Sequence, residues 1–269
     1  MSPPRLARGP AALARLHAGR PVILVPTMGA LHEGHLSLLR RARAWADRRP
    51  GAVVCASVFV NPLQFGPKED YGSYPRGLRR DLRLLAGLAD SCYAPSVAAM
   101  YPEPQDVMVA PPPLGDELCG AFRPGFFTGV LTVVAKLLAQ VSPAAAVFGE
   151  KDYQQLVLVK RMVRQLGFGC QVLAGPLVRE RDGLALSSRN AYLEHSASAR
   201  RRSALRCARR KKRSPAAWRP AAPARGRGGN LQKMASRSTT SSVAASTSAR
   251  TRRARASWSW APCGSAGRG

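Results

Sequence analysis

Two of the four histidines, His32 and His35, lie three residues apart, just after a short apolar run. Residues three apart share one face of a helix. Gly29 and Gly34 let the backbone approach a ligand closely, and a helix N-terminus offers N–H groups and a positive dipole end to an anion. The pattern predicts a cradle for a triphosphate, with two surface histidines capping a turn as the alternative. A zinc site is disfavoured, because H-E-G-H lacks the H-E-x-x-H spacing and no third ligand stands out.

A lysine and a carboxylate form the second candidate group. Lys151 and Asp152 follow an apolar run that ends at Phe148, with Gly149 at the junction. The lysine could neutralise charge that develops on a phosphate, and the carboxylate could hold a hydrated Mg²⁺. The alternative is a solvated helix start, where acidic residues are favourable.

Two hydroxyls and an arginine form the third group. Ser187, Ser188 and Arg189 lie on a loop that carries a glycine, Gly183. A guanidinium next to two hydroxyls on such a loop is typical of a mobile phosphate clamp. One loop of this kind is a weak signal by itself.

Two neutral polar residues, Asn61 and Gln64, follow a second apolar run, which ends at Val60. Their amides suit the orientation of a substrate that carries hydroxyl or carboxylate groups, so both are predicted to bind substrate. A turn-forming role for the asparagine is the alternative.

Alternating strands and helices must position these groups. Apolar runs rich in β-branched residues predict buried strands, whereas apolar residues at helical spacing predict helices. The predicted strands cover residues 21–25, 52–60, 144–148 and 170–178. The predicted helices cover residues 38–46, 78–88, 130–141 and 152–166, with Thr128 as the N-cap of the third.

This alternation predicts an α/β fold with a parallel sheet and right-handed crossovers. In such sheets, ligands bind at the carboxyl ends of the strands near the topological switch point. The polar groups described above all follow predicted strands, so we expect them to meet at this edge.

Composition bounds the class of protein. The chain has 269 residues and a formal net charge of +27. Its six cysteines form no C-x-x-C pair, which argues against a zinc ribbon or a disulfide framework. Neither a membrane span nor a secretory signal is indicated, because no apolar stretch is long enough. We therefore expect a reduced, soluble, cytoplasmic protein.

The charge is distributed unevenly along the chain. Residues 1–194 contain 23 Lys and Arg and all 15 Asp and Glu, whereas residues 195–269 contain the other 19 basic residues. The second segment also has few large apolar residues, too few to offset the entropy of ordering it. The sequence thus predicts a folded domain over 1–194 and a disordered basic tail over 195–269.

Taken together, five stretches of the chain closely resemble the pantothenate synthetase family. They occur in the family's order, and the resemblance covers roughly residues 15–194. The stretches are Pro26–His35, Val58–Gly66, Tyr74–Arg76, Phe148–Gln155 and Asp182–Asn190. The resemblance implies a Rossmann-like nucleotidyltransferase domain with an H-x-G-H motif and a later loop similar to K-M-S-K-S.

The resemblance also implies an activity. In this family, pantoate and ATP give pantoyl adenylate and diphosphate, and β-alanine then displaces AMP to give pantothenate on the route to coenzyme A. The implied partners are ATP with Mg²⁺, pantoate, β-alanine and a second copy of the chain in a homodimer. No membrane partner is implied.

Roles carry over to the matching residues. His35 is implied as the proton donor to the phosphates, with His32 and Lys151 as further catalytic residues. Gln64 is implied to bind both pantoate and β-alanine, and Gln155 to bind pantoate. The implied ATP site consists of Met28, Gly29, Ala30, Leu31, His32, Glu33, Gly34, His35, Gly149, Glu150, Lys151, Asp152, Val178, Leu186, Ser187, Ser188 and Arg189.

The chain departs from the family in two places. Phe126 stands where the family stretch R-P-G-H-F has a histidine, so a polar contact near the site is expected to be missing. After Glu194, a basic sequence without acids replaces the small C-terminal domain that closes over the nucleotide. A frameshift near residues 194–200 explains such a composition, and a genuine basic tail is the alternative.

Three hypotheses about function follow. The intact motifs favour an active pantothenate synthetase. The altered tail favours a folded but impaired ligase that lacks its lid, because closure and exclusion of water matter at an acyl-adenylate site. The charge of the tail alone favours a protein that binds nucleic acid nonspecifically.

Overall fold

The computed structural model describes residues 2–67 and 69–193. Its strands are β1 (Arg5–Ala7), β2 (Val22–Thr27), β3 (Val53–Val58), β4 (Ser91–Tyr93), β5 (Ala145–Gly149) and β6 (Gln171–Gly175). Its α-helices are α1 (Pro10–His17), α2 (Glu33–Ala46), α3 (Leu78–Leu85), α4 (Val97–Met100), α5 (Cys119–Phe122), α6 (Phe126–Val141) and α7 (Tyr153–Gln165). Short 3₁₀ turns are η1 (Pro62–Gln64), η2 (Pro113–Asp116), η3 (Glu150–Asp152) and η4 (Ser188–Leu193).

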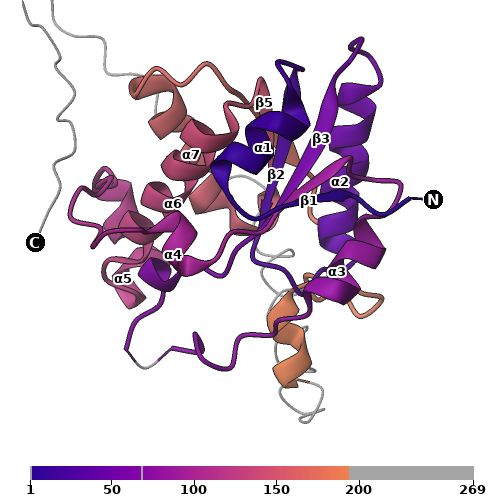
Figure 1. Cartoon of the computed structure of the whole chain (residues 1–269). Coiled ribbons are helices and arrows are strands. Elements are labelled where there is room, and N and C mark those ends of the chain that lie inside the picture. The colour runs from indigo at the N-terminus through magenta and orange to yellow at the C-terminus, as the bar shows by residue number, and fades with distance from the viewer. Residues whose placement is uncertain (1, 68, 194–269) are drawn as a thin grey trace, which may run out of the picture. The chain divides into compact units, whose positions relative to one another are not determined.

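The strands form one parallel sheet in the order β1-β4-β3-β2-β5-β6 (Figure 1). From β2 the chain moves outward through β3 to β4, and then returns to the other side of β2 with β5 and β6. The order of the strands therefore reverses between β2 and β5. In open parallel sheets this reversal creates the crevice where ligands bind.

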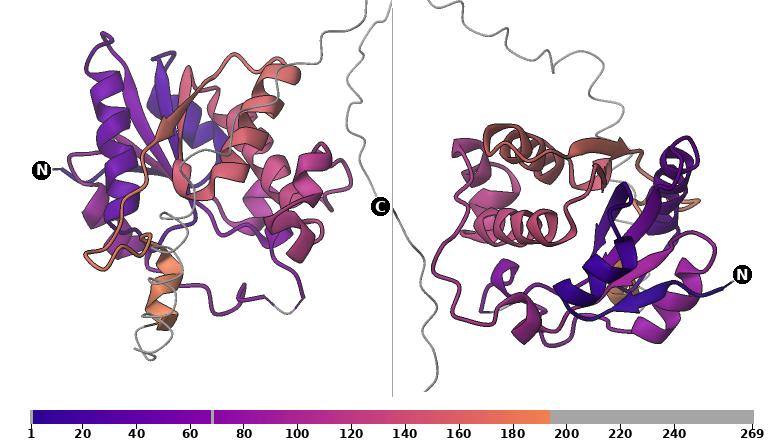
Figure 2. Two further views of the ribbon diagram at one scale, coloured as in Figure 1. Left: turned by 180° about the vertical axis from the view of Figure 1, so that it is seen from behind. Right: turned by 45° about the horizontal axis from the view of Figure 1, so that its top comes forward.

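Helices cover both faces of the sheet (Figure 2). Alternate residues of β2 belong to opposite faces: Leu24 packs with residues of α6 and α7, whereas Ile23 and Val25 pack with residues of α2. The β2 residues that face either side of the sheet are buried. A strand that is buried on both faces has a continuously apolar sequence. The predicted α/β fold with a parallel sheet is confirmed.

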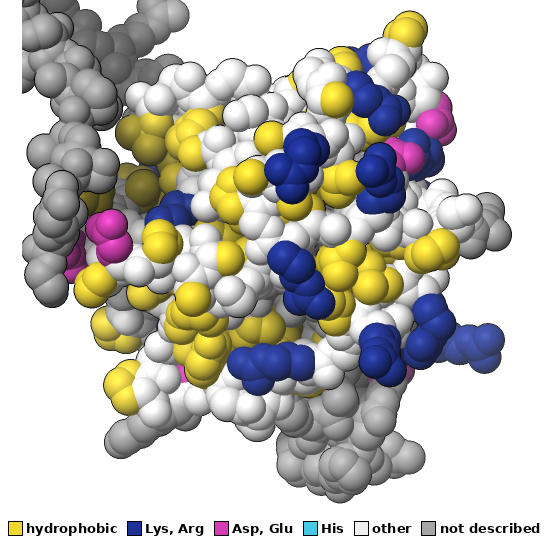
Figure 3. Space-filling model, viewed as in Figure 1, with side chains coloured by type: hydrophobic (Ala, Val, Ile, Leu, Met, Phe, Trp, Pro, Cys, Tyr) yellow, Lys and Arg dark blue, Asp and Glu magenta, His cyan; other side chains and the backbone are white. Residues whose placement is uncertain are grey.

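The face of the molecule drawn in Figure 3 carries basic side chains among many hydrophobic ones. On the face drawn in Figure 3, Lys and Arg side chains lie in separate groups and outnumber Asp and Glu. Within residues 2–67 and 69–193, every helix is too short or too polar to span a bilayer. The predicted basic tail, residues 195–269, lies outside the described residues.

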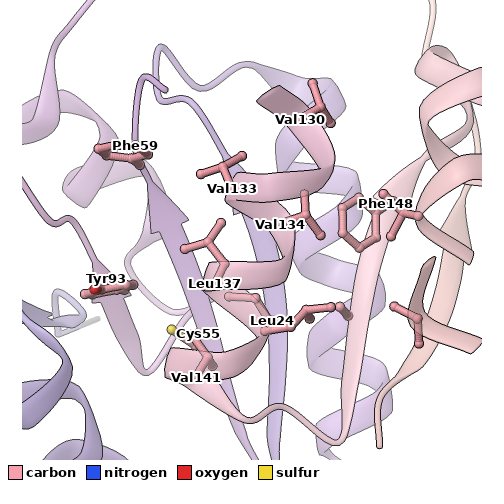
Figure 4. Packing of buried hydrophobic residues seen from close by; sticks show 14 of the residues in the cluster. Leu24, Cys55, Phe59, Tyr93, Val130, Val133, Val134, Leu137, Val141 and Phe148 are labelled. Carbon is pink, nitrogen blue, oxygen red and sulfur yellow. The ribbon is translucent and has the colours of Figure 1, made fainter. Parts of the chain in front are cut away.

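The helix α6 packs its apolar face onto β2, β3 and β5 (Figure 4). Its residues Val133, Val134 and Leu137 are all less than 10% exposed. The helix is N-capped by Gly125 at a positive φ of 78°. The predicted N-cap, Thr128, is therefore wrong: it lies inside the first turn, where its carbonyl accepts a hydrogen bond from the Thr132 hydroxyl.

The other predicted elements are found with shifted ends. The four predicted strands correspond to β2, β3, β5 and β6, and the helices to α2, α3, α6 and α7. Two short strands were not predicted, β1 at the edge of the sheet and its neighbour β4, nor were the helices α1, α4 and α5. The strands β1 and β4 have only three residues each, too few to give a periodic pattern.

The backbones of α6 and η1 approach each other closely at Gly129. A Cβ placed on Gly129 would lie 2.0 Å from the Leu63 carbonyl oxygen and 2.8 Å from the Gln64 nitrogen. The Gly129 carbonyl also accepts a 3.1 Å hydrogen bond from the side chain of Asn61. Only glycine fits at this crossing, because backbone atoms on the other side cannot move aside alone.

We expect Gly129→Ala to lower the free energy of unfolding by about 2 kcal/mol, because an added methyl group forces helix and turn apart. The measurement is urea unfolding of the full chain. The matched control is Gly169→Ala, where nothing lies within 4 Å of the added carbon. A Gly129→Ala protein as stable as this control would contradict the close approach.

Candidate active site

The loop after β2 runs along the crevice and adopts an unusual backbone conformation. Gly29 has φ 85° and Ala30 has φ 50°, both in the left-handed region. The Gly29 N–H donates a 3.2 Å hydrogen bond to the hydroxyl of Thr27 at the end of the strand. A left-handed conformation is costly for alanine, so other contacts must hold this turn.

A buried carboxylate supplies those contacts. Asp81, in the first turn of α3, is 1% exposed and accepts hydrogen bonds from the N–H groups of Ala30 (3.1 Å) and Leu31 (2.9 Å). A Cβ on Gly29 would lie 3.0 Å from the same carboxylate. Because a buried carboxylate is costly without donors, it fixes the loop by requiring both N–H groups.

The two predicted histidines cap helix α2. The His32 ring accepts a 3.1 Å hydrogen bond at Nδ1 from the Gly34 N–H, and His35 Nδ1 accepts a 3.3 Å bond from the His32 N–H. Their ring centroids are 4.0 Å apart. Two N–H groups that were expected to be free for an anion are therefore engaged by the imidazoles. Because each Nδ1 accepts, a neutral ring carries its proton on Nε2 and can donate it to a ligand.

Both imidazoles favour the neutral form. Burial lowers the pKa of His35 to about 3, with further contributions from the charges of His32 and Lys151. Burial, followed by Lys151 and Arg80, also lowers the pKa of His32. At neutral pH the pair thus offers two uncharged N–H donors next to a cation.

The second predicted group follows β5 in the turn η3. The Nζ of Lys151 lies 3.4 Å from the carboxylate of Asp152, whose side chain is 60% exposed. The described residues contain no cluster of three His, Cys, Asp or Glu that could hold a metal ion. One exposed carboxylate suits an ion that arrives with a phosphate ligand and keeps most of its water.

The third predicted group lies against the first. The Ser188 hydroxyl donates a 3.2 Å hydrogen bond to the Ala30 carbonyl, and the Arg189 N–H donates a 3.3 Å bond to the Ser187 hydroxyl. The predicted clamp thus touches the loop that carries the two histidines, although the segments are more than 150 residues apart.

A cavity of about 480 Å³ lies at this edge of the sheet. Most of the predicted site residues line it: Met28, His32, Gly34, His35, Gln64, Gly149, Lys151, Asp152, Gln155, Val178, Leu186, Ser187, Ser188 and Arg189. Six predicted residues do not line it: Gly29, Ala30, Leu31, Glu33, Asn61 and Glu150. The first three shape the loop, and Glu33 pairs with Arg40 on the exposed side of α2.

Asn61 lies behind Gln64 and does not face the cavity. It is 1% exposed, and its Oδ1 accepts hydrogen bonds from the Tyr101 hydroxyl (2.8 Å) and the Leu63 N–H (3.3 Å). Its Nδ2 donates to Gln64 Oε1 (3.2 Å) and to a carbonyl of α6. With its amide engaged in these bonds, Asn61 orients Gln64, and its role as a substrate-binding residue stays a prediction.

Phe126 also lines the cavity, where the sequence suggested a missing polar contact. Its ring lies under the guanidinium of Arg123 at 3.6 Å and contacts Phe127 at a centroid distance of 4.8 Å. The phenylalanine therefore supports an arginine of the cavity wall by a cation–π contact.

Sequence reasoning missed Asp81, Glu69, Asp70 and Arg123. The side chain of each makes hydrogen bonds with a residue 50 or more positions away, which periodicity cannot indicate. A signal did exist for Glu69 and Asp70, two consecutive acids within a basic protein, five and six residues after Gln64.

Comparisons with known proteins agree with the geometry. A family model described as Pantoate-beta-alanine ligase matches residues 6–254. The pantothenate synthetase of Mycolicibacterium smegmatis is 57% identical over 178 residues, which are 66% of this chain and 55% of the relative. That of Sphingopyxis alaskensis is 54% identical over 184 residues, 68% of this chain and 64% of the relative. The chain thus spans little more than half the length of the first of these relatives.

Solved structures agree as well. The pantothenate synthetase of Thermus thermophilus is 52% identical with a TM-score of 0.67, covering 75% of this chain and 71% of that one. The pantoate-beta-alanine ligase of Francisella tularensis, complexed with beta-gamma ATP and beta-alanine, is 37% identical with a TM-score of 0.66, covering 71% and 73%. The predicted nucleotidyltransferase-like fold is therefore confirmed.

The depressed pKa of His35 predicts acid sensitivity. The unfolded chain binds a proton at this residue below about pH 6.5, whereas the folded chain resists protonation until about pH 3. Stability is therefore fully present above pH 6.5 and is lost as the pH falls toward 3, by up to about 1.4 kcal/mol per pH unit. Urea unfolding of wild type and His35→Asn at pH 7, 6, 5 and 4.5 measures this, since Asn Oδ1 replaces Nδ1 as acceptor. Equal pH dependence in both proteins would contradict the assignment.

We expect Asp81→Asn to lower the free energy of unfolding by about 2–4 kcal/mol. Asparagine keeps one acceptor oxygen but turns an N–H₂ group toward the second backbone donor. Urea unfolding measures the loss, and amide hydrogen exchange at Ala30 and Leu31 locates it. The matched control is Asp47→Asn, since Asp47 is 3.9 Å from Arg43 and largely exposed. Similar stability of the two variants would show that the buried carboxylate does not hold the loop.

Proposed function

Because the chain belongs to the pantoate-beta-alanine ligase family, we propose that it joins pantoate to β-alanine in an ATP-dependent reaction. The observation that carries the proposal is the meeting of three family motifs around one cavity at the switch point of the sheet. The substrates, the adenylate intermediate and the site roles below belong to this proposal.

ATP binds along the loop from Met28 to His35, with its phosphates between the cap of α2 and the Ser187–Arg189 turn. The Nε2–H groups of the two histidines donate to phosphate oxygens, and Lys151 supplies positive charge. Mg²⁺ accompanies the nucleotide, and the carboxylate of Asp152 fits one of its ligand positions. This arrangement supports the inferred ATP site, which also includes Gly149, Val178 and Leu186.

Pantoate binds between Gln64 and Gln155, which both line the cavity. The amide of Gln64 is held in place, because its Oε1 accepts from Asn61 and its Nε2 lies 3.0 Å from the Met28 sulfur. A preset amide orients hydroxyl and carboxylate groups without losing further side-chain entropy. Gln64 also contacts β-alanine in the second step.

In the first step, a carboxylate oxygen of pantoate attacks the α-phosphorus of ATP and the bond to the β-phosphate oxygen breaks. Diphosphate leaves, and pantoyl adenylate remains. In the second step, the amine of β-alanine attacks the acyl carbon and AMP leaves. Both displacements depend on alignment and on neutralisation of negative charge rather than on a nucleophilic side chain.

His35 acts in this scheme as a hydrogen-bond donor. The family resemblance implies a proton donor to the phosphates, whereas burial lowers the pKa of His35 and favours the neutral ring in the cavity. Its neutral Nε2–H donates to the leaving diphosphate and retains the proton. Lys151, close enough to lower the pKa of both histidines, is the charged partner of the leaving group.

Two alternatives stay open as outcomes of the same experiment. A ligase that binds ATP but turns over poorly is supported by the altered sequence after Glu194, where the family's closing domain is expected. Nonspecific binding of nucleic acid by the basic segment 195–269 is supported by its charge. The predicted homodimer and cytoplasmic location remain predictions.

The full chain is expected to release diphosphate from ATP when pantoate is added, and to form pantothenate when β-alanine follows. Lys151→Ala should lower the rate of diphosphate release by about 10²-fold, because it removes the charge that faces the leaving group. Lys160→Ala is the matched control, an exposed lysine of α7 outside the cavity lining.

Three results distinguish the hypotheses. Diphosphate release without pantothenate indicates the impaired ligase. No release from a folded protein that does bind ATP indicates a site without catalysis. No ATP binding, together with salt-dependent binding to DNA, would reject the ligase function for this chain.

A further inference from the structure

Two arginines of the cavity wall are each held by an acidic residue, and the two acids are consecutive in the sequence. Arg189 donates to the Asp70 carboxylate from Nε (3.1 Å) and Nη2 (2.8 Å). Arg123 donates to the Glu69 carboxylate from Nε (2.6 Å) and Nη2 (2.6 Å). The segment with Glu69 and Asp70 therefore forms ion pairs with two arginines that come from distant parts of the chain.

Both ion pairs use the same edge of the guanidinium. An arginine has five N–H donors in a fixed plane, and the edge formed by Nε and Nη2 matches a carboxylate. The two donors on Nη1 stand outside each ion pair. Because Arg123 and Arg189 both line the cavity, these remaining donors can serve an anionic ligand while the carboxylate stays bound.

Aromatic rings lie near both guanidiniums, in stacking contact at Arg123 and at the outer limit of a cation–π contact at Arg189. Arg123 lies 3.6 Å above the Phe126 ring, and Arg189 lies about 6 Å from the rings of Phe65 and Tyr74. Stacking and a bidentate pair together leave an arginine little rotational freedom. Arginines fixed in this way lose little entropy when they bind an anion.

The segment that carries the two acids is itself anchored. Phe65 contacts Tyr71 and Tyr74 at centroid distances of 5.4 and 5.9 Å. Arg76 donates to the carbonyls of Tyr71 (2.8 Å) and Gly72 (3.2 Å), which gives the Tyr74–Arg76 motif a structural purpose. Carboxylates on an anchored segment are suited to holding arginines in place rather than to being displaced by a ligand.

We propose that Glu69 and Asp70 are positioning residues that fix Arg123 and Arg189 at the cavity wall, with the Nη1 end of each guanidinium left for the anionic groups of the substrates. The inference rests on the proposed function for the identity of those groups. Arg189, next to the Ser187–Ser188 hydroxyls, meets the phosphates of ATP. Arg123, bonded to the Gln64 carbonyl at 3.1 Å, meets a substrate carboxylate.

The first experiment titrates ATP, and separately inorganic tripolyphosphate, into the full chain and into Asp70→Asn. We expect the Kd for both probes to rise about tenfold in the variant. The side-chain NH₂ group of asparagine would face one N–H donor of Arg189, so the bidentate pair that holds the guanidinium would be lost. Tighter or unchanged binding would overturn the proposal, because tighter binding means that Asp70 competes with the ligand. Wild type that binds tripolyphosphate but not ATP rejects the proposed function alone, and wild type that binds neither rejects both.

The second experiment separates positioning from general stability. If Asp70 acts through Arg189, the double variant Asp70→Asn/Arg189→Lys should bind ATP no more weakly than Arg189→Lys alone. Additive losses would overturn the proposal. The matched control is Asp90→Asn, because Asp90 pairs with Arg43 at 2.7 Å and neither residue lines the cavity. This variant should lower Tm without changing the Kd for ATP.

The third experiment tests Glu69, and it can be carried out even if the Asp70 variants fail to fold. Glu69→Gln should leave the Kd for ATP within about twofold of wild type and weaken binding of pantoate or of β-alanine about tenfold, measured by titration of each acid. Loss of ATP affinity without any loss of affinity for the two acids would overturn the assignment of Arg123 to a carboxylate.

Discussion

The site depends first on one buried carboxylate. Asp81 is buried, and burying a carboxylate costs free energy unless hydrogen bonds replace those that it made with water. Two backbone N–H groups of the β2–α2 loop supply these hydrogen bonds. That requirement holds Ala30 in a left-handed conformation, which a residue with a Cβ disfavours, next to Gly29, which adopts it readily. Because α2 begins directly after this turn, the carboxylate on α3 also sets where the helix starts and which way its first side chains face.

The electrostatics of the cavity follow from that start. The capping of α2 by two imidazoles directs each Nδ1 inward and leaves each Nε2 for a ligand, while burial keeps the rings neutral. The arginines of the wall are paired with carboxylates, so Lys151, with an exposed and weakly paired neighbour, is the least compensated cation of the described lining. A site built in this way avoids strong mutual repulsion between cations when it is empty, and still offers many N–H donors to an anion.

The sequence predicted those features that arise from local pattern. Continuous apolar runs indicated β2, β3 and β5, and polar motifs at their carboxyl ends indicated the cavity residues, because a parallel sheet brings such ends together. Strands of three residues, such as β1 and β4, carry no period, and an acid in the first turn of a helix looks like an ordinary favourable charge. The role of Asp81 and the orienting role of Asn61 depend on distances between segments, which no local pattern contains.

The described walls of the cavity come only from residues between Pro26 and Arg189. The described groups that can bind and align an anion are therefore all encoded before residue 194. Exclusion of water is a separate requirement of the proposed reaction, because water would hydrolyse an acyl adenylate. Under the proposed function, a change confined to the region after Glu194 should therefore act on turnover more than on recognition, since the described N–H donors at the cavity are positioned by Asp81 and by the sheet.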